Sequence, residues 1–140
     1  MTEFATGGTA MSVDVWLKTL AGAWEQRDPD AAAALFTDDA TYSTDPHAPP
    51  KRGRSAIRAY WAGEIAGQDG VTVRFGTPVV SGNRATAEWW ATLHDSADGP
   101  ATLAGIVVLR FAADGRCSDL REYWMASPWA IAEPQPGWGT

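Results

Sequence analysis

The chain has 140 residues, of which 45% are hydrophobic and 20% are charged, a length and balance typical of one globular domain. Its net charge of −6 and the lack of a Lys/Arg-rich stripe argue against binding to nucleic acid or to an anionic membrane. The single cysteine, Cys117, excludes an internal disulfide and fits a reducing compartment. There is no signal-peptide pattern and no run of about 18 apolar residues, so we expect a cytoplasmic protein.

Local signals in the first half of the chain predict three helices. Residues 1–11 are small and polar and should form a flexible leader, so the folded domain is expected to span residues 12–126. Apolar periodicity and capping residues predict helices over residues 12–27, over residues 31–36 after Asp28-Pro29-Asp30, and from Gly53 to about Gly67. A short strand over residues 40–44 and a proline-rich loop over residues 45–50 should separate the last two helices.

In the second half of the chain the apolar pattern changes to a period of two, which is typical of strands. One strand is expected from Val71, and three consecutive strands between Ala85 and Trp124. Helices followed by strands predict an α+β fold, in which three N-terminal helices pack on one face of a curved, mostly antiparallel sheet and form a cone. The Pro- and Trp-rich tail, residues 127–140, should pack on this domain.

Alternation of side chains along a strand predicts which face of the sheet each residue joins. The set that contains Phe111 is continuous and bulky, so we assign it to the inner face, together with Trp89 on the preceding strand. On the last strand the inner set would be Ser118, Leu120, Glu122 and Trp124. The outer face would then carry an apolar patch of Trp90, Ile106 and Val108. A monomer should not expose such a patch, so we expect a homodimer through this sheet face; the alternative is that the tail or a loop covers it.

Several local strings resemble the nuclear transport factor 2-like (NTF2-like) superfamily, in particular its SnoaL-like, polyketide-cyclase-type branch. They are Ala-Leu-Phe-Thr-Asp-Asp-Ala-Thr-Tyr (34–42), Pro-Pro…Gly-Arg-Ser-Ala-Ile (49–57), Val-Leu-Arg-Phe (108–111), Asp-Gly-Arg (114–116) and Leu-Arg-Glu-Tyr-Trp (120–124). The resemblance covers residues 12–126 and implies a cone-shaped NTF2-like fold. The superfamily includes isomerases, cyclases, epoxide hydrolases, dehydratases and pure binding domains, so the fold alone does not define the reaction.

Two chemistries of the superfamily match this sequence only in part. The resemblance to limonene epoxide hydrolase-like enzymes places their last-strand acid at Glu122 and a water-binding tyrosine at Tyr42. Their asparagine, arginine and second aspartate fall on Thr44, Trp89 and Ala91.

Ketosteroid isomerase-like enzymes place an acid on the first strand, and Asp45 lies one position from it. The two donors of their oxyanion hole fall on Leu20 and Val107, which cannot donate a hydrogen bond.

Glu122 is the principal candidate for acid–base chemistry, because desolvation among apolar side chains would raise its pKa. If Glu122 instead points outward and pairs with Arg121 or Arg110, it has no such role. Tyr42 is either a hydrogen-bond donor at the pocket floor or an ordinary core tyrosine. Asp45 and His47 flank Pro46 at the expected pocket mouth, where they could form an acid–base pair or simply be solvated.

The tryptophans could line an apolar pocket or fill the cone and leave no cavity. The residues expected to bind substrate are Trp16, Trp24, Thr44, Trp61, Trp89, Val107, Phe111 and Trp124. No metal site is expected, since His47 and His94 are the only imidazoles, and no cofactor is expected. The sequence therefore predicts a cofactor-free enzyme of cyclase, isomerase, dehydratase or hydrolase type that acts on a hydrophobic small molecule. The alternative is a non-catalytic ligand-binding or assembly module on the same scaffold.

Overall fold

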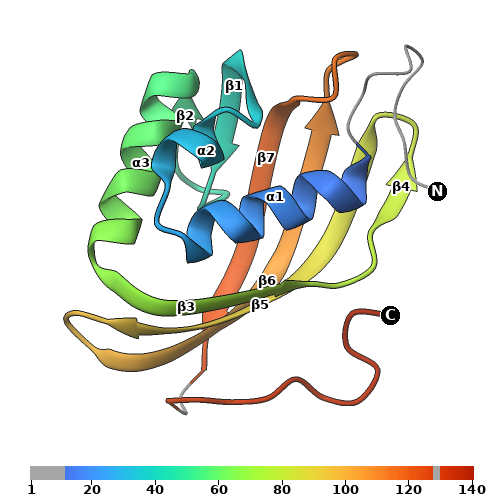
Figure 1. Ribbon diagram of the computed structural model, residues 1–140. Helices are drawn as coiled ribbons and strands as arrows, with labels where there is room; N and C mark the ends of the chain where they lie inside the picture. The colour runs from blue at the N-terminus through green and yellow to red at the C-terminus, as the bar shows by residue number, and fades with distance from the viewer. Residues whose placement is uncertain (1–11, 128–129) are drawn as a thin grey trace.

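Three helices cover one face of a strongly curved sheet (Figure 1). The computed structural model describes residues 12–127 and 130–140; the predicted leader, residues 1–11, and Trp129 of the tail lie outside the described residues. The helices are α1 (Val13–Glu25), α2 (Pro29–Ala33) and α3 (Arg54–Ala66). The strands are β1 (Phe36–Ser43), β2 (Lys51–Arg52), β3 (Gln68–Phe75), β4 (Val79–Ser81), β5 (Arg84–Asp95), β6 (Gly99–Phe111) and β7 (Cys117–Ala126). The predicted α+β fold with a curved sheet is confirmed.

Helices α1 and α2 begin where capping side chains satisfy their first backbone N–H groups. The Ser12 hydroxyl accepts from the Val15 N–H at 3.2 Å, and the Asp28 carboxylate accepts from the Ala31 N–H at 3.0 Å. Arg58 of α3 pairs with Asp30 of α2 at 2.5 Å. This ion pair connects α2 to α3, the helix that carries Tyr60 and Trp61.

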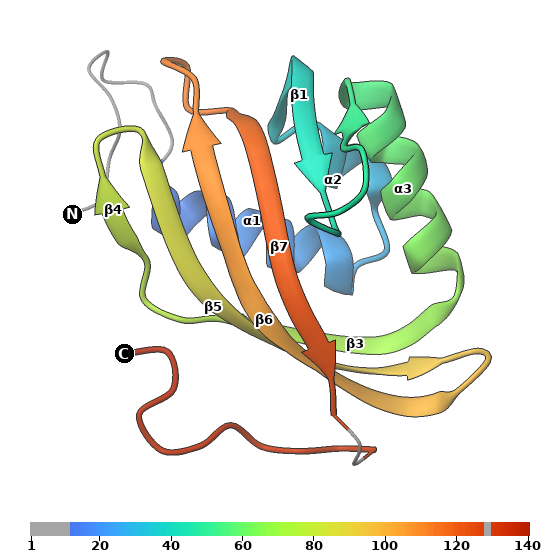
Figure 2. The same ribbon diagram turned by 180° about the vertical axis from the view of Figure 1, so that it is seen from behind.

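The strands follow the order β2-β1-β7-β6-β5-β3, with β4 paired to β5 beside β3. The pair of β1 with β7 is parallel, and the other pairs are antiparallel. The last strand therefore lies between β1 and β6 (Figure 2), and Tyr42 becomes the neighbour of Leu120. This arrangement places the first and last strands of the domain side by side at the site.

Strand β1 is longer than predicted. It begins at Phe36, which was assigned to the second helix, and includes residues 37–39, which were assigned to a break. Its register against β7 shifts between Phe36 and Thr41, so the polar residues of this stretch are accommodated by an irregularity within the strand. The sequence reading also missed β2, a two-residue strand next to the proline-rich loop.

The predicted faces of β5 and β6 are confirmed, because Trp89, Val107 and Phe111 are buried. On β7 the register against β6 shifts between Arg110 and Phe111. The shift turns Cys117 inward, where it is fully buried, and leaves Ser118 half-buried with its hydroxyl bound to the Arg110 carbonyl at 3.2 Å. The prediction that Ser118 faces the core is therefore wrong, since one extra residue reverses the alternation.

The tail returns along the outer face of the sheet, which the helices do not cover (Figure 2). The Trp90 indole donates to the Ala132 carbonyl at 3.1 Å, and the Thr102 hydroxyl donates to the Ala130 carbonyl at 3.0 Å. Trp138 stacks edge-on against Trp90 at 5.9 Å. The tail therefore covers part of the outer patch predicted from the sequence.

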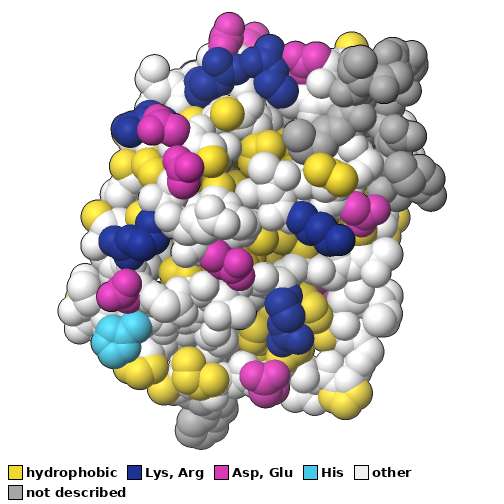
Figure 3. Space-filling view, in the orientation of Figure 1, with side chains coloured by type: hydrophobic (Ala, Val, Ile, Leu, Met, Phe, Trp, Pro, Cys, Tyr) yellow, Lys and Arg dark blue, Asp and Glu magenta, His cyan; other side chains and the backbone are white. Residues whose placement is uncertain are grey.

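On the side that bears the helices, the described residues place charged side chains of both signs among apolar ones and form no basic stripe (Figure 3). No helix within the described residues combines the length and the apolar character needed to cross a bilayer.

Candidate functional site

The hollow between the helices and the sheet is almost completely filled. A cavity of about 10 Å³ remains, lined by Leu20, Trp24, Tyr42, Trp61, Phe75, Trp89, Val107, Leu120 and Glu122. Trp24 meets Trp61 and Trp89 edge-on, with ring centroids 5.4 and 5.9 Å apart. Ligand pockets usually measure about 300–1,000 Å³. The expected substrate-sized pocket is thus absent from this part of the described structure, because the three indoles occupy its volume.

Glu122 lies in the lining of this cavity, on the inner face of β7, as the strand alternation predicted. The Tyr60 hydroxyl donates to its Oε1 at 3.3 Å. Burial raises the pKa of Glu122 to about 7, and the nearby charge of Glu64 adds to this effect. Hydrogen bonds from Tyr60 and Tyr42 and the charge of Lys51 act in the opposite direction. A carboxyl with this pKa can both accept and donate a proton near neutral pH.

Arg121, one of the two partners of the outward alternative, pairs with Asp119 at 3.2 Å instead.

Two tyrosines accompany the carboxyl. Tyr42 is 2% exposed, and its ring lies 5.2 Å from the ring of Tyr60. Burial, followed by the charge of Glu122, raises the pKa of both phenols, so both stay protonated and can donate hydrogen bonds. Tyr60 was not among the predicted site residues. Its place beside Trp61 in the apolar stripe of α3 was the available signal.

The indole N–H groups near the cavity differ in their partners. Trp24 donates to the Gln68 side chain at 2.7 Å. Trp61 and Trp89 are only 5% and 3% exposed, yet their Nε1 atoms have no hydrogen-bond partner within the described residues. Unpartnered buried donors are rare in folded proteins and call for a specific explanation.

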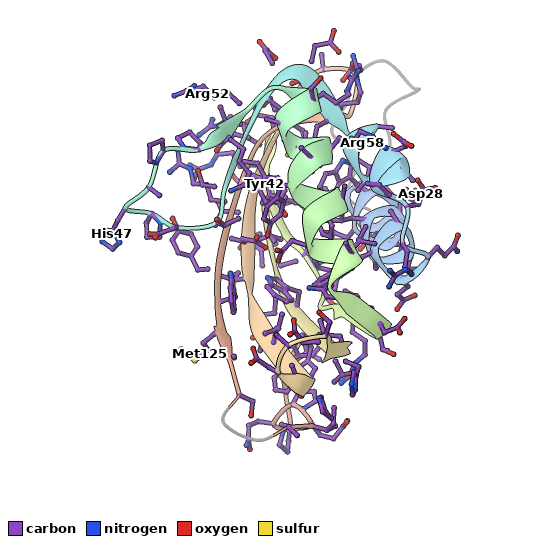
Figure 4. The ribbon with its side chains drawn as sticks, turned by 90° about the vertical axis from the view of Figure 1, so that its left-hand side faces the viewer. Asp28, Tyr42, His47, Arg52, Arg58 and Met125 are labelled. Atoms are coloured by element: carbon purple, nitrogen blue, oxygen red, sulfur yellow. The ribbon has the colours of Figure 1, made fainter. Side chains whose placement is uncertain are left out.

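The loop that carries Asp45 and His47 lies on the outer side of the sheet, and His47 points away from Tyr42 (Figure 4). The side chain of His47 is 91% exposed, and its Nδ1 lies 3.3 Å from Asp45 Oδ1. The two residues therefore form a pair, but the loop does not form the mouth of the inner cavity as expected.

Asp45 instead borders an outer groove of about 420 Å³, whose lining also includes Arg52, Asp119, Arg121 and Glu122.

Four residues expected to bind substrate lie outside the cavity lining. Trp16 and Phe111 pack edge-on at 5.6 Å in the core, where the Trp16 indole donates to the Leu35 carbonyl at 3.0 Å. Thr44 follows the end of β1 and is half-buried.

Trp124, which was expected to face inward, is 48% exposed and borders an outer groove with Ile106 and Met125. It lies opposite Gly105, where a Cβ would overlap the Tyr123 carbonyl oxygen.

No group of three or more His, Cys, Asp or Glu side chains in the described ranges could hold a metal ion.

An open α+β cone with a carboxyl group at the floor of an aromatic core defines the class of this protein. A model of the SnoaL-like domain matches residues 17–120, so the chain belongs to the SnoaL-like family of the NTF2-like superfamily.

Three similar proteins can be named. A steroid Delta-isomerase from Nocardioides simplex is 32% identical over 96 residues, which cover 69% of this chain and 76% of that protein. SalBIII is an epoxide hydrolase/cyclase-like enzyme with a role in pyran ring formation in the polyether salinomycin. Its structure matches this one with a TM-score of 0.69 at 19% sequence identity, and the match covers 79% of this chain and 88% of SalBIII. A hypothetical protein from Catenulispora acidiphila with a ketosteroid isomerase-like fold, solved in complex with trimethylamine, also has a TM-score of 0.69, at 23% identity over 77% of this chain and 83% of that one. The solved structures confirm the fold, and the named relatives include enzymes of this family.

Proposed function

We propose that this protein is a cofactor-free enzyme that moves a proton within a small hydrophobic substrate, with Glu122 as the proton carrier. The observation that supports this function best is the buried carboxyl of Glu122, which meets the Tyr60 hydroxyl at 3.3 Å at the edge of an apolar cavity. The similarity to a steroid Delta-isomerase favours the isomerase type among the reactions of the superfamily.

The proposed chemistry is proton transfer between two carbon atoms. In the ionised form Glu122 would remove a proton from a carbon next to an electron-withdrawing group, and it would return this proton at a second carbon. Because its pKa is about 7, Glu122 is a stronger base than an exposed glutamate and is still substantially ionised near neutral pH. The Tyr60 hydroxyl orients the carboxylate by its hydrogen bond.

Substrate entry requires side chains to move, since the cavity of about 10 Å³ has room for one small group. The lining includes Trp24 and Phe75, which are contributed by separate elements, α1 and β3. Displacement of these rings would enlarge the space next to Glu122. We therefore propose an induced fit, in which the substrate takes the place of an aromatic side chain.

The test is an assay for double-bond migration in a β,γ-unsaturated ketone, either a steroid or a bicyclic ketone, with wild type, Glu122→Gln and Tyr60→Phe. We expect Glu122→Gln to lower kcat by about 100- to 10,000-fold, the usual effect of a general base. The wild-type kcat should rise with pH through about pH 7 as the carboxyl ionises. Tyr60→Phe should move this inflection to higher pH, because the Tyr60 hydrogen bond lowers the pKa of Glu122.

A matched control is Glu133→Gln, which makes the same change at an exposed tail residue and should leave kcat unaltered. Turnover that survives Glu122→Gln at full rate would contradict the proposal.

The second candidate is a binding or assembly module without turnover, and the small size of the cavity favours it. A thermal-shift screen of hydrophobic molecules separates the two candidates. The enzyme predicts that Glu122→Gln binds a ligand that only the wild type converts, whereas the module predicts binding without conversion by either protein.

A further inference from the structure

The two-residue strand β2 brings a lysine to the Glu122 carboxyl. β2 pairs antiparallel with β1 and contacts α3, and its Lys51 lies directly opposite Tyr42. Side chains of directly opposite residues in an antiparallel pair project from the same face of the sheet. Tyr42 is buried on the inner face, so the half-buried Lys51 projects to the same side. The short strand therefore directs Lys51 toward the aromatic residues around Glu122.

The ammonium of Lys51 lies over an aromatic ring. Its Nζ is 4.6 Å from the centroid of the Tyr60 ring, within the range of about 6 Å for a cation–π interaction. Among the described residues, no carboxylate lies within ion-pairing distance of this ammonium. The face of the Tyr60 ring is thus the contact that the structure gives to this charge.

The same tyrosine binds the carboxyl. The Tyr60 hydroxyl donates to Glu122 Oε1 at 3.3 Å, which is longer than the usual O–H···O distance of about 2.7–2.8 Å. A hydrogen bond of this length breaks after a small displacement of the ring that carries the hydroxyl. Tyr42 contacts the Tyr60 ring with centroids 5.2 Å apart, and Lys51 provides a further contact. The position of the Tyr60 hydroxyl therefore depends on these two neighbours.

We propose that Lys51 is a positioning residue of this site, whose ammonium holds the Tyr60 ring where the hydroxyl reaches Glu122. This role rests on the proposed function, in which Glu122 carries the proton. Lys51 acts on Glu122 by two routes, through the Tyr60 hydroxyl and directly through space as a nearby positive charge. Both routes favour the ionised carboxyl, and so both keep the base form available near neutral pH.

The groups that face the Glu122 carboxyl come from three elements. They are Tyr42 on β1, Tyr60 and Glu64 on α3, and Lys51 on β2. Burial and the charge of Glu64 raise the pKa of Glu122, whereas the two tyrosine hydrogen bonds and the charge of Lys51 lower it. Removal of the Lys51 charge should therefore raise this pKa, and so should a weaker hydrogen bond from Tyr60.

The experiment is a double-mutant cycle on the titration of Glu122, followed by 13C NMR of labelled glutamate. Lys51→Met removes the charge but keeps a long, unbranched side chain, and it is made in wild type and in Tyr60→Phe. In wild type the midpoint should rise by about 0.5–1 pH unit, at the lower end of the effect of a nearby opposite charge. In Tyr60→Phe the rise should be about half as large or less, because no hydroxyl remains to be positioned.

Two substitutions serve as controls. Lys51→Arg keeps a cation that stacks on aromatic rings, and it should leave the midpoint unchanged. Lys18→Met makes the same change as Lys51→Met at the other lysine of the chain, which is exposed on α1, and should have no effect. The pH at which kcat rises should shift as the midpoint does in each of these variants, which a purely structural role of Lys51 would not cause.

The contact between Lys51 and Tyr60 can be observed without turnover. Lys18 and Lys51 are the only lysines in the sequence, so 13C-labelled lysine gives one set of signals from each. The ring current of Tyr60 should move the Lys51 Hε signals upfield of those of Lys18. This upfield shift should persist in Tyr60→Phe, which keeps the ring, and disappear in Tyr60→Leu, which removes it.

The positioning role would be overturned by a rise in Tyr60→Phe as large as that in wild type, by no rise in either, or by Lys51 signals without the upfield shift. Activity assays keep this result separate from the proposed function. If wild type converts no β,γ-unsaturated ketone but the two rises differ as expected, Lys51 still positions the Tyr60 hydroxyl and the enzymatic proposal fails. If Glu122→Gln abolishes turnover but the two rises are equal, the enzymatic proposal stands and the role of Lys51 fails.

Discussion

At the scale of single residues, the buried carboxyl of Glu122 makes stability depend on pH. Its pKa is raised from 4.5 to about 7 by folding, so the folded state holds this proton more tightly than the unfolded chain does. The stabilisation is complete below about pH 4.5 and is lost as the pH rises through about 7. Tyr60, Tyr42, Glu64 and Lys51 are the groups that influence this titration.

We expect the stability of Glu122→Gln not to fall in this way as the pH rises. Relative to wild type, its free energy of unfolding should increase by about 2–3 kcal/mol between pH 4.5 and pH 8, as the shift in pKa implies. Urea unfolding of both proteins across this range measures the difference. For the control Glu133→Gln, the difference in free energy of unfolding from wild type should be the same at each pH. A difference between Glu122→Gln and wild type that does not change with pH would mean that the carboxyl is solvated in the folded protein.

The inward position of Glu122 could be predicted from sequence, because alternation along β7 is a local rule that holds between Leu120 and Glu122. The same rule failed for Ser118, where a register shift interrupts the alternation, and for Trp124, which is 48% exposed. The filled cavity could not be predicted either. It depends on the way three indoles from α1, α3 and β5 pack together, and their spacing in the sequence does not encode this.

At the scale of secondary-structure elements, the position of β7 depends on Gly105 of β6. This glycine lies opposite Trp124, and a Cβ at this position would overlap the Tyr123 carbonyl oxygen and contact the Trp124 backbone. Both of these are backbone contacts, which cannot move without displacing the strand. Because Glu122 lies on the same strand two residues earlier, the strand pair also helps to position the proposed proton carrier.

We therefore expect Gly105→Ala to push β7 away from β6. The free energy of unfolding should fall by about 1–3 kcal/mol, the usual cost of overpacking, and the Glu122 carboxyl should titrate closer to 4.5 as water enters. Chemical denaturation and 13C NMR of labelled glutamate measure the two effects. Gly63→Ala is the matched control: it lies on α3 with open space around it and should stabilise the helix by up to about 1 kcal/mol. Equal effects of both substitutions would show that the strand spacing is not critical.

The starts of the helices were predicted well because their signals are local, whereas the predicted end of the second helix was three residues too late. Ser12 and Asp28 cap the first turns they precede, and α3 follows Gly53, which adopts a φ of 89°. The position of β1 is not local, since its parallel partner β7 lies about eighty residues away in the sequence and its register shifts midway. Only the resemblance to the NTF2-like superfamily could indicate that these two strands meet.

At the scale of the whole molecule, the outer face of the sheet remains apolar after the tail has packed on it. The tail binds Trp90 and Thr102, so the alternative that the tail covers this face holds for part of the patch. Ile106, Tyr123 and Met125 remain 36%, 42% and 73% exposed along a groove of about 510 Å³. An exposed patch of this kind on neighbouring strands favours association, and we keep the homodimer through this face as a proposal.

If the outer face is the interface, a charge placed at its centre should separate the subunits. We expect wild type to sediment as a dimer at micromolar concentration and Met125→Asp to sediment as a monomer, because a buried unpaired carboxylate in the interface is strongly unfavourable. Val15→Asp makes a comparable change at a residue that is 50% exposed on α1, on the helix side, and should remain dimeric. Sedimentation velocity over a hundredfold range of concentration measures all three proteins. This face would be excluded as the interface if wild type stays monomeric throughout, or if Met125→Asp dimerises as readily as wild type. Ile106, Tyr123 and Met125 would then line an exposed apolar groove with a different partner.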